Sequence, residues 1–163
     1  MNTKMLMLIF HIGDNLYAID SSCVVEVIPR VSYRPVHHVP DYVAGLFNYR
    51  GTIVPAIDLC HLIRGTPSQA NLSTRVMMVS YPGQNNKLQY VGLMAERVIK
   101  TLKKSKNEFV KSGIQNTNVP YLNEMIMDEE FMIQHIDLEQ LFIHLQETKL
   151  LGVGGNIDVI GSY

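Results

Sequence analysis

Positions 45 to 59 read Gly45-Leu46-Phe47-Asn48-Tyr49-Arg50-Gly51-Thr52-Ile53-Val54-Pro55-Ala56-Ile57-Asp58-Leu59. Two largely apolar runs, Leu46–Arg50 and Ile53–Ile57, flank Gly51 and predict two short strands. Because glycine tolerates the positive φ of a tight turn, Gly51 is expected to join these strands. Asp58 then stands where its carboxylate can accept hydrogen bonds from the first amides of a helix. The stretch therefore predicts a strand, a turn, a second strand and a capped helix.

The end of this stretch recurs later in the chain. Ile57-Asp58-Leu59-Cys60-His61-Leu62-Ile63 and Ile136-Asp137-Leu138-Glu139-Gln140-Leu141-Phe142 share the form Ile-Asp-Leu-x-x-Leu-apolar, 79 residues apart. In both copies the aspartate is placed to cap a helix and to favour the positive end of its dipole. The repeat predicts two related β lobes.

Short strands punctuated by turns account for most of the remaining sequence. Besides the two strands above, the pattern predicts strands at Met5–Ile12, Leu16–Ile19, Val24–Ile28, Arg75–Tyr81, Leu88–Leu93, Val98–Leu102, Tyr121–Met127 and Phe131–Ile136. One helical turn is expected at Pro40–Gly45, and the clearest helix at Leu138–Gln146. Many short strands with few helices indicate a mainly β fold of small barrels or a sandwich.

The domain organisation follows from the loops. The segment Gly65–Thr74 is rich in Gly, Pro, Ser, Asn and Thr and is the best candidate boundary between the lobes. We expect one domain over 1–163, with a first barrel near 1–70, a second barrel with the C-terminal helix near 71–150, and a tail at 151–163.

Composition excludes several classes of function. The 163 residues include 47% hydrophobic and 18% charged residues, and the net charge is −1. No basic excess points to nucleic acid, and no apolar run approaches the roughly 20 residues that cross a bilayer. Cys23 and Cys60 show neither metal spacing nor a disulfide framework, so a reducing cytoplasm is expected.

No constellation of catalytic residues stands out. The six histidines include no pair at i, i+4 with metal-site neighbours, and Gly152–Gly155 follows the last helix, the wrong context for a nucleotide loop. Cys60 and His61 are adjacent on a helix, so their side chains diverge. We expect no enzyme, no cofactor and no metal. A ligand-sensing β-barrel module, or an enzyme with an unrecognised site, remains open.

The feature that stands out is a pair of opposite charges in two apolar strands. Glu26 shares a strand face with Val24 and Ile28, and Arg50 shares one with Asn48 and Leu46. If the two side chains meet, two roles are open. The pair either only fixes the arrangement of the strands, or it belongs to a contact surface whose apolar residues exclude water.

Charge also segregates along the second half. Arg97, Lys100, Lys103, Lys104, Lys106 and Lys111 cluster together, whereas the stretch from Glu124 to Glu147 contains seven acids and no lysine or arginine. Solvated loops explain this, and so do two docking faces of opposite sign.

The opening stretch resembles the core motif of the CheW-like chemotaxis adaptor family, Gly-x-x-Asn-x-Arg-Gly-x-x-x-Pro-x-x-Asp-Leu, at every fixed position. The resemblance extends to Tyr17-Ala18-Ile19, Val24-x-Glu26-Val27, Val91-Gly92-Leu93 and Arg97-Val98, and the whole length fits a stand-alone member. It implies two SH3-like five-stranded β-barrels with short helices.

The resemblance also implies a function without catalysis. It implies a cytoplasmic adaptor, recruited to membrane receptor arrays, that couples the cytoplasmic tip of a chemoreceptor (a methyl-accepting chemotaxis protein) to the regulatory domain of a CheA-type histidine kinase. The receptor-binding residues expected from the motif and its neighbours are Val24, Glu26, Ile28, Gly45, Leu46, Asn48, Arg50 and Gly51. The kinase contact is expected at barrel ends, with no residues assigned. Ala95-Glu96 and Glu124 depart from the family pattern, which leaves open a non-flagellar signalling array.

Overall fold

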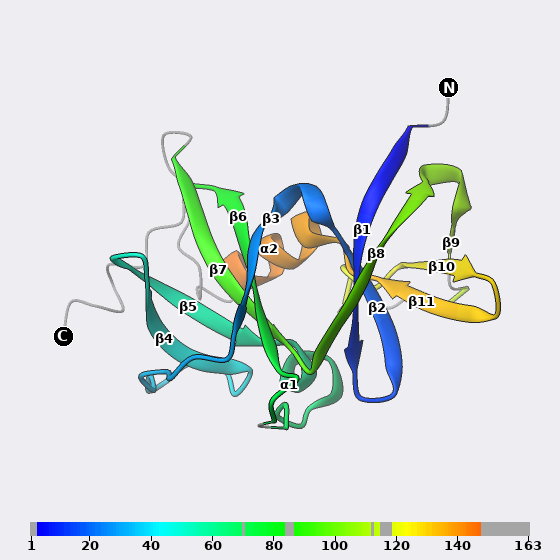
Figure 1. Cartoon of the computed structure of the whole chain (residues 1–163). Coiled ribbons are helices and arrows are strands. Elements are labelled where there is room, and N and C mark those ends of the chain that lie inside the picture. Colours follow the sequence, from blue (N-terminus) through cyan, green and yellow to red (C-terminus); the bar gives the residue numbers. More distant parts are fainter. Residues whose placement is uncertain (1–2, 70, 84–86, 112, 115–118, 148–163) are drawn as a thin grey trace.

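The computed structural model describes residues 3–69, 71–83, 87–111, 113–114 and 119–147. Two sheets dominate it (Figure 1). Sheet A has the order β8–β1–β2–β11–β10–β9, with β1 Lys4–Ile12, β2 Asn15–Asp20, β8 Arg97–Ser105, β9 Phe109–Lys111, β10 Glu124–Asp128 and β11 Phe131–His135. Sheet B has the order β3–β6–β7–β5–β4, with β3 Val24–Pro29, β4 Val43–Tyr49, β5 Thr52–Asp58, β6 Arg75–Pro82 and β7 Leu88–Ala95. The expected mainly β class is confirmed.

Helices are short, as expected. The α-helices are α1 Leu59–Arg64 and α2 Leu138–Glu147, and two 3₁₀ turns are η1 Ser21–Cys23 and η3 Lys106–Glu108. Among the described residues no helix has the length and apolar character needed to cross a membrane. The expected tail at 151–163 lies outside the described residues.

The largest core lies between the two sheets. It combines Leu8 and Phe10 of β1 with Met77 and Val79 of β6, and α2 covers it with Leu138, Leu141, Phe142 and Leu145 (Figure 1). The alternate residues of the same two strands point into two smaller cores, Met7 and Ile9 within sheet A and Val76 and Met78 within sheet B. Because β1 and β6 are buried on both faces, their sequences are nearly continuous apolar runs.

The two sheets exchange hairpins. The hairpin β1–β2 lies in sheet A beside the later strands of the chain, whereas β6–β7 lies in sheet B beside β3, β4 and β5. In each sheet a pair of parallel strands joins the exchanged hairpin to the other strands, β2 with β11 in sheet A and β5 with β7 in sheet B. The sheets therefore do not correspond to the lobes expected at 1–70 and 71–150, because each sheet is built from both halves of the chain. Sheet A also contains a sixth strand, β9.

Hydrogen bonds repeat with the 79-residue offset seen in the sequence. The amide of Asp58 donates to the carbonyl of Tyr42 at 2.8 Å, and the amide of Asp137 donates to the carbonyl of Tyr121 at 2.9 Å. The two aspartates then accept from helix amides, Asp58 from His61 and Asp137 from Gln140. This confirms both predicted caps and the repeat.

One predicted element is wrong. Pro40–Gly45 was expected to form a helical turn, but β4 begins at Val43 after a single turn hydrogen bond from its amide to the carbonyl of Pro40 at 3.0 Å. Gly45 lies in the strand with φ of 144°, and a Cβ there would approach the Arg34 carbonyl oxygen to 2.4 Å. The glycine is needed for the close passage of residue 34, which pairs with Leu46.

The two caps differ in burial, which gives a first prediction. Asp58 is 6% exposed and also accepts two hydrogen bonds from Ser68. Replacing Asp58 by alanine should lower the free energy of unfolding by about 2 kcal/mol or more, because buried donors lose their partner. Asp137→Ala, which removes one cap bond, should lower it by about 1 kcal/mol. Urea unfolding of both variants checks this, and equal losses would contradict it.

A second prediction concerns His135, which is buried against Phe109 with 4.9 Å between the ring centroids. Burial lowers the pKa of His135 below its ordinary value, and outweighs the opposite influence of Asp137, Glu124 and Asp20, while Lys106 acts in the same direction as burial. Below the ordinary histidine pKa of about 6.5, the unfolded chain therefore binds a proton that the folded chain resists.

The free energy of unfolding should fall as the pH is lowered from 7.5 to 5.5, and His135→Gln should reduce this fall. Urea unfolding at the two pH values measures the difference, since the other five histidines are common to both proteins. An equal pH dependence of the two proteins would contradict the assignment.

Candidate functional site

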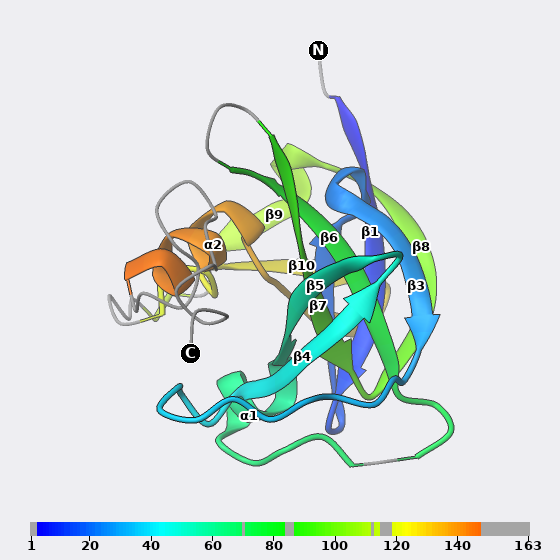
Figure 2. The same cartoon turned by 90° about the vertical axis from the view of Figure 1, so that its left-hand side faces the viewer.

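The predicted ion pair is present and joins the two edges of sheet B. Glu26 lies on β3 and Arg50 follows β4, the strands at opposite ends of the sheet order. An Arg50 Nη2 to Glu26 Oε1 distance of 2.7 Å links them. Figure 2 shows the end of β4 reaching β3, so that the sheet curls towards a closed barrel.

A third residue, Tyr49, completes the pair. Its hydroxyl donates a hydrogen bond to the same oxygen, Oε1 of Glu26, and its ring lies 5.3 Å from the Arg50 guanidinium carbon. Burial, together with the hydrogen bond to Glu26, raises the pKa of Tyr49, so the phenol remains a donor. The sequence interpretation missed Tyr49, although its inward place beside Phe47 on an alternating strand is a usable signal.

The ion pair is fixed at one end and open at the other. The side chain of Glu26 is 31% exposed, but that of Arg50 is 71% exposed. An ion pair this exposed contributes about 0–1 kcal/mol to stability, and breaking it costs far less than breaking a buried pair. Its remaining guanidinium donors face solvent and are available to another molecule.

The turn that carries Arg50 explains two residues of the motif. Arg50 and Gly51 both have positive φ, 50° and 88°, as a two-residue hairpin turn with the twist of the flanking strands requires. Asn48 Oδ1 accepts a hydrogen bond from the Gly51 amide at 2.7 Å. Arg50 therefore lies in the turn and not at the end of the strand.

The apolar residues expected around the pair are oriented differently from the prediction. Val24 packs against the core between the sheets and Ile28 against the core of sheet B, while Leu46 is half-buried. The exposed apolar side chains of β3 are Val25 and Val27, on its other face. Strand alternation predicts that Val24 and Ile28 lie on one face of β3 and that Val25 and Val27 lie on the other. It does not predict which of the two faces is exposed to water.

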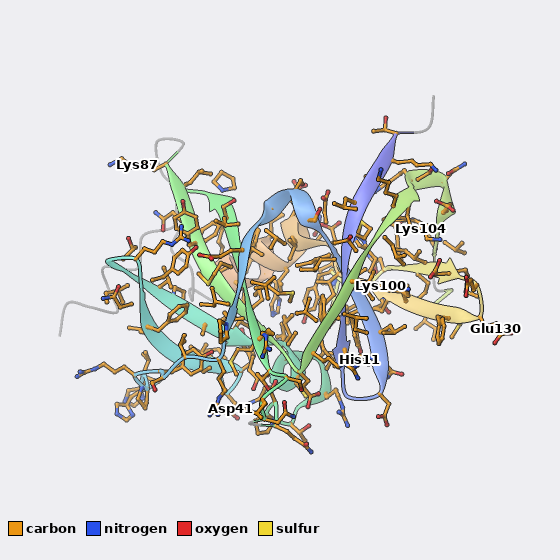
Figure 3. All side chains as sticks on the ribbon, viewed as in Figure 1. His11, Asp41, Lys87, Lys100, Lys104 and Glu130 are labelled. Carbon is orange, nitrogen blue, oxygen red and sulfur yellow. The ribbon has the colours of Figure 1, made fainter. Side chains whose placement is uncertain are left out.

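Sheet A is closed at the corresponding place, with the charges reversed. Lys104 of β8 lies 3.1 Å from Asp128, at the end of β10, and the two side chains are 12% and 20% exposed. Lys100 and Lys106 face Asp128 and Glu124 at 4.0 Å each. Figure 3 shows Lys100 and Lys104 along β8 beside the hairpin whose tip carries Glu130. Part of the segregated charge of the sequence thus pairs within sheet A, where Lys100, Lys104 and Lys106 meet Asp128 and Glu124.

The offset of 79 residues places Glu129 at the position equivalent to Arg50. Both residues have positive φ in a hairpin turn, 55° and 50°. The tip of sheet B is therefore basic and the tip of sheet A is acidic. Beside Glu129, the hairpin of sheet A exposes Met127, Phe131 and Met132.

Among the described residues, no group of three or more His, Cys, Asp or Glu side chains is arranged to hold a metal ion. The structure instead presents two hairpin tips, one basic and one acidic, and charged side chains join each tip to an edge strand of its sheet.

The two roles left open for the Glu26–Arg50 pair differ in their effect on stability. Arg50→Ala should lower the free energy of unfolding by less than about 1 kcal/mol, because the arginine is exposed. Tyr49→Phe should lower it by about 1–2 kcal/mol, because it removes a donor from a partly buried carboxylate. Urea unfolding at pH 7 measures both, and a loss above about 3 kcal/mol for Arg50→Ala would assign the pair a mainly structural role.

Comparison with known proteins agrees with the fold and the motif. A crystal structure of the scaffolding protein TtCheW from Thermoanaerobacter tengcongensis superposes with a TM-score of 0.72 at 22% identity, over 94% of this chain and 92% of that one. That likeness supports two SH3-like β lobes.

Curated relatives match shorter stretches. The chemotaxis protein CheW of Helicobacter pylori is 35% identical over 75 residues, 46% of each chain, and that of Treponema pallidum is 42% identical over 50 residues, 31% of this chain and 29% of that one. The matched stretch thus spans less than half the length of either relative. The family model for the CheW-like domain matches residues 6–146, and the chain therefore belongs to the CheW-like domain family.

Proposed function

We propose that this protein is a non-enzymatic chemotaxis adaptor that binds a chemoreceptor tip and a CheA-type histidine kinase at the same time. The observation that carries the proposal is the state of Arg50, which Glu26 and Tyr49 hold in place while 71% of its side chain remains exposed. A fixed, exposed arginine beside apolar side chains has the composition of an interface hot spot.

The receptor contact is proposed at the tip and edge of sheet B. The residues expected from the motif are Val24, Glu26, Ile28, Gly45, Leu46, Asn48, Arg50 and Gly51. Of these, Arg50 and Asn48 are exposed polar residues, and Ile53, paired with Asn48 across the hairpin, is 55% exposed. Val25 and Val27 add exposed apolar surface on β3. An amphipathic receptor helix matches this mixture of apolar and charged groups.

The kinase contact is proposed at the tip of sheet A. Simultaneous binding requires a second surface, and the hairpins β4–β5 and β10–β11 lie on opposite sides of the molecule (Figure 1). Met127, Phe131 and Met132 are exposed around the acidic turn of β10–β11. Apolar side chains ringed by acids suit a partner surface that is apolar with basic residues around it.

The absence of catalysis remains part of the proposal. Cys60 is 1% exposed, and burial raises the pKa of its thiol, which is the opposite of what a nucleophilic cysteine requires. The proposed place of action is the cytoplasm, at receptor arrays to which the partners recruit the protein. A non-flagellar array remains an alternative output.

The ligand-sensing alternative has weaker support. A pocket in sheet A has a volume of about 270 Å³ and is lined by Ile9, Leu16 and Ile133, with Lys100 and Asp128 among the other residues. Ligand pockets usually hold roughly 300–1,000 Å³, so this one lies below the usual range.

The adaptor proposal predicts two separable losses. Arg50→Ala should weaken binding to an isolated receptor tip about tenfold and leave binding to the kinase regulatory domain within about twofold. Phe131→Ser should do the reverse, because its side chain lies on the other hairpin. Pull-down and titration with both purified partners measure this, with Arg97→Ala, an exposed arginine of β8, as the matched control.

If the folded wild-type protein bound neither partner, the adaptor assignment would be wrong. Equal weakening of both partners by Arg50→Ala, together with a large drop in melting temperature, would favour a purely structural pair.

A further inference from the structure

A second feature lies apart from the two hairpin tips. Residues 29–33, at and after the end of β3, and residues 71, 72, 74 and 75, before and at the start of β6, line an open cleft of about 830 Å³. Ala44 of β4 forms part of its wall. The volume falls within the usual range for ligand sites, so the cleft has room for several residues of an extended peptide.

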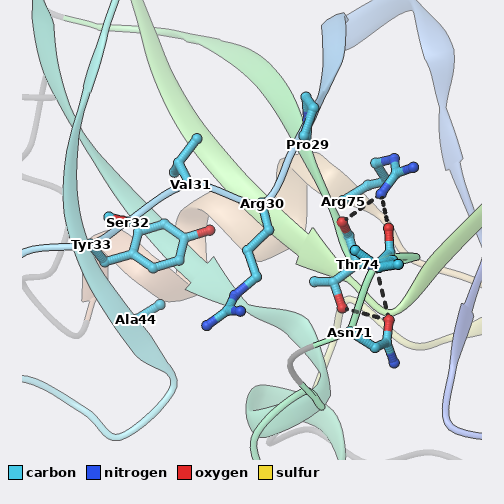
Figure 4. A pocket seen from close by; sticks show the side chains of 10 residues that line it. Pro29, Arg30, Val31, Ser32, Tyr33, Ala44, Asn71, Thr74 and Arg75 are labelled. Atoms are coloured by element: carbon cyan, nitrogen blue, oxygen red, sulfur yellow. Dashed lines mark hydrogen bonds between the residues drawn. The ribbon is translucent and has the colours of Figure 1, made fainter.

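Arg30 is the free charge of this cleft. Figure 4 shows its side chain extending between Tyr33 and Ala44 on one side and Asn71 on the other. The guanidinium forms no ion pair or hydrogen bond with any residue that the structure describes, in contrast to the paired Arg50. Arginine presents five donors in a planar fork that matches a carboxylate.

Arg75 and Asn71 also keep hydrogen-bond donors available at the cleft. Arg75 Nη1 donates to the carbonyls of Leu72 and Thr74 at 2.5 and 3.0 Å, which fixes its guanidinium and leaves its other N–H groups for a ligand. The Asn71 side-chain oxygen accepts from the amides of Ser73 and Thr74, so its NH₂ group remains available. Burial raises the pKa of Tyr33 to about 12, so this wall carries no negative charge near neutral pH.

None of the described residues that line the cleft is acidic. The carboxylate of Asp58 contributes to the raised pKa of Tyr33, and its oxygens accept hydrogen bonds from Cys60, His61 and Ser68. Asp58 is thereby committed to its helix cap and to Ser68. Arg30 and Arg75 therefore both line the cleft, and neither forms an ion pair with a carboxylate among the described residues.

The rim adds an apolar contact. Leu72 is 96% exposed, and Pro29 and Val31 border the same space. A free inorganic anion would use the arginines but neither the apolar rim nor most of the volume. An acidic peptide that also carries an apolar residue would use all three.

We propose that this cleft binds a short acidic segment of a partner protein, with its carboxylates on Arg30 and Arg75 and an apolar side chain against Leu72. The inference does not depend on the proposed function, because it uses none of the residues assigned there to the exposed hairpin tips. It adds an acidic peptide segment to the kinds of partner that this protein is proposed to bind.

The probe is the blocked peptide acetyl-Gly-Glu-Glu-Leu-Glu-Glu-Gly-amide, titrated into the ¹⁵N-labelled full chain at low salt. The matched probe replaces each glutamate by glutamine, and a third titration uses inorganic phosphate. The acidic peptide should give saturable shifts of the amides of Ser32, Tyr33 and residues 71–75. Arg30→Gln should weaken its binding about tenfold, the loss expected for one charged hydrogen-bonding group.

Arg97→Gln, which removes an exposed arginine outside the cleft, should leave the peptide affinity unchanged, and melting temperatures should show that both variants are folded. The glutamine peptide should bind at least about tenfold more weakly, because it lacks the charges. The proposal is overturned if no saturable shift appears, if the shifts lie elsewhere, if Arg30→Gln binds like the wild type, or if phosphate binds as tightly as the peptide.

Discussion

Burial of two strands on both faces is the constraint on which the rest of the structure depends. β1 and β6 each contribute alternate residues to the core between the sheets and to the core of their own sheet. Neither strand can be removed without opening two cores at once. Since β1 lies in sheet A and β6 in sheet B, the two halves of the chain are held to each other through the same side chains that hold each sheet.

This arrangement explains how two small barrels support exposed tips. Each sheet borrows its central hairpin from the other repeat, and its outer strands close through side chains. In sheet B the closing groups are Glu26, Tyr49 and Arg50, and in sheet A they are Lys104 and Asp128. Equivalent positions of a repeated fold thus carry opposite charges, so one molecule presents a basic tip and an acidic tip and can distinguish two partners by charge.

Several parts of the site followed from the order of residues. The Gly51 turn and the two aspartate caps depend on short-range geometry, which alternation and turn chemistry describe well. The opposite charges of Glu26 and Arg50 favoured a pair, but their contact joins the two opposite edges of sheet B and depends on the closure of that sheet. The role of Tyr49, the inward orientation of Val24 and Ile28, and the helical turn wrongly expected at Pro40–Gly45 depend on contacts with distant segments. Gly45, for example, is explained only by the passage of Arg34 against it.

The mainly β class, the repeat and the family motif can be read from the residues alone, because each is a local pattern of turns, caps and apolar periods. The exchange of hairpins between the repeats, the pairing of Lys100 and Lys104 with Asp128 across sheet A, and the place of Arg30 and Arg75 in the lining of one cleft emerge only from the folded chain. These contacts join segments 24 to 117 residues apart, and they follow from shared burial, which a single sequence does not display.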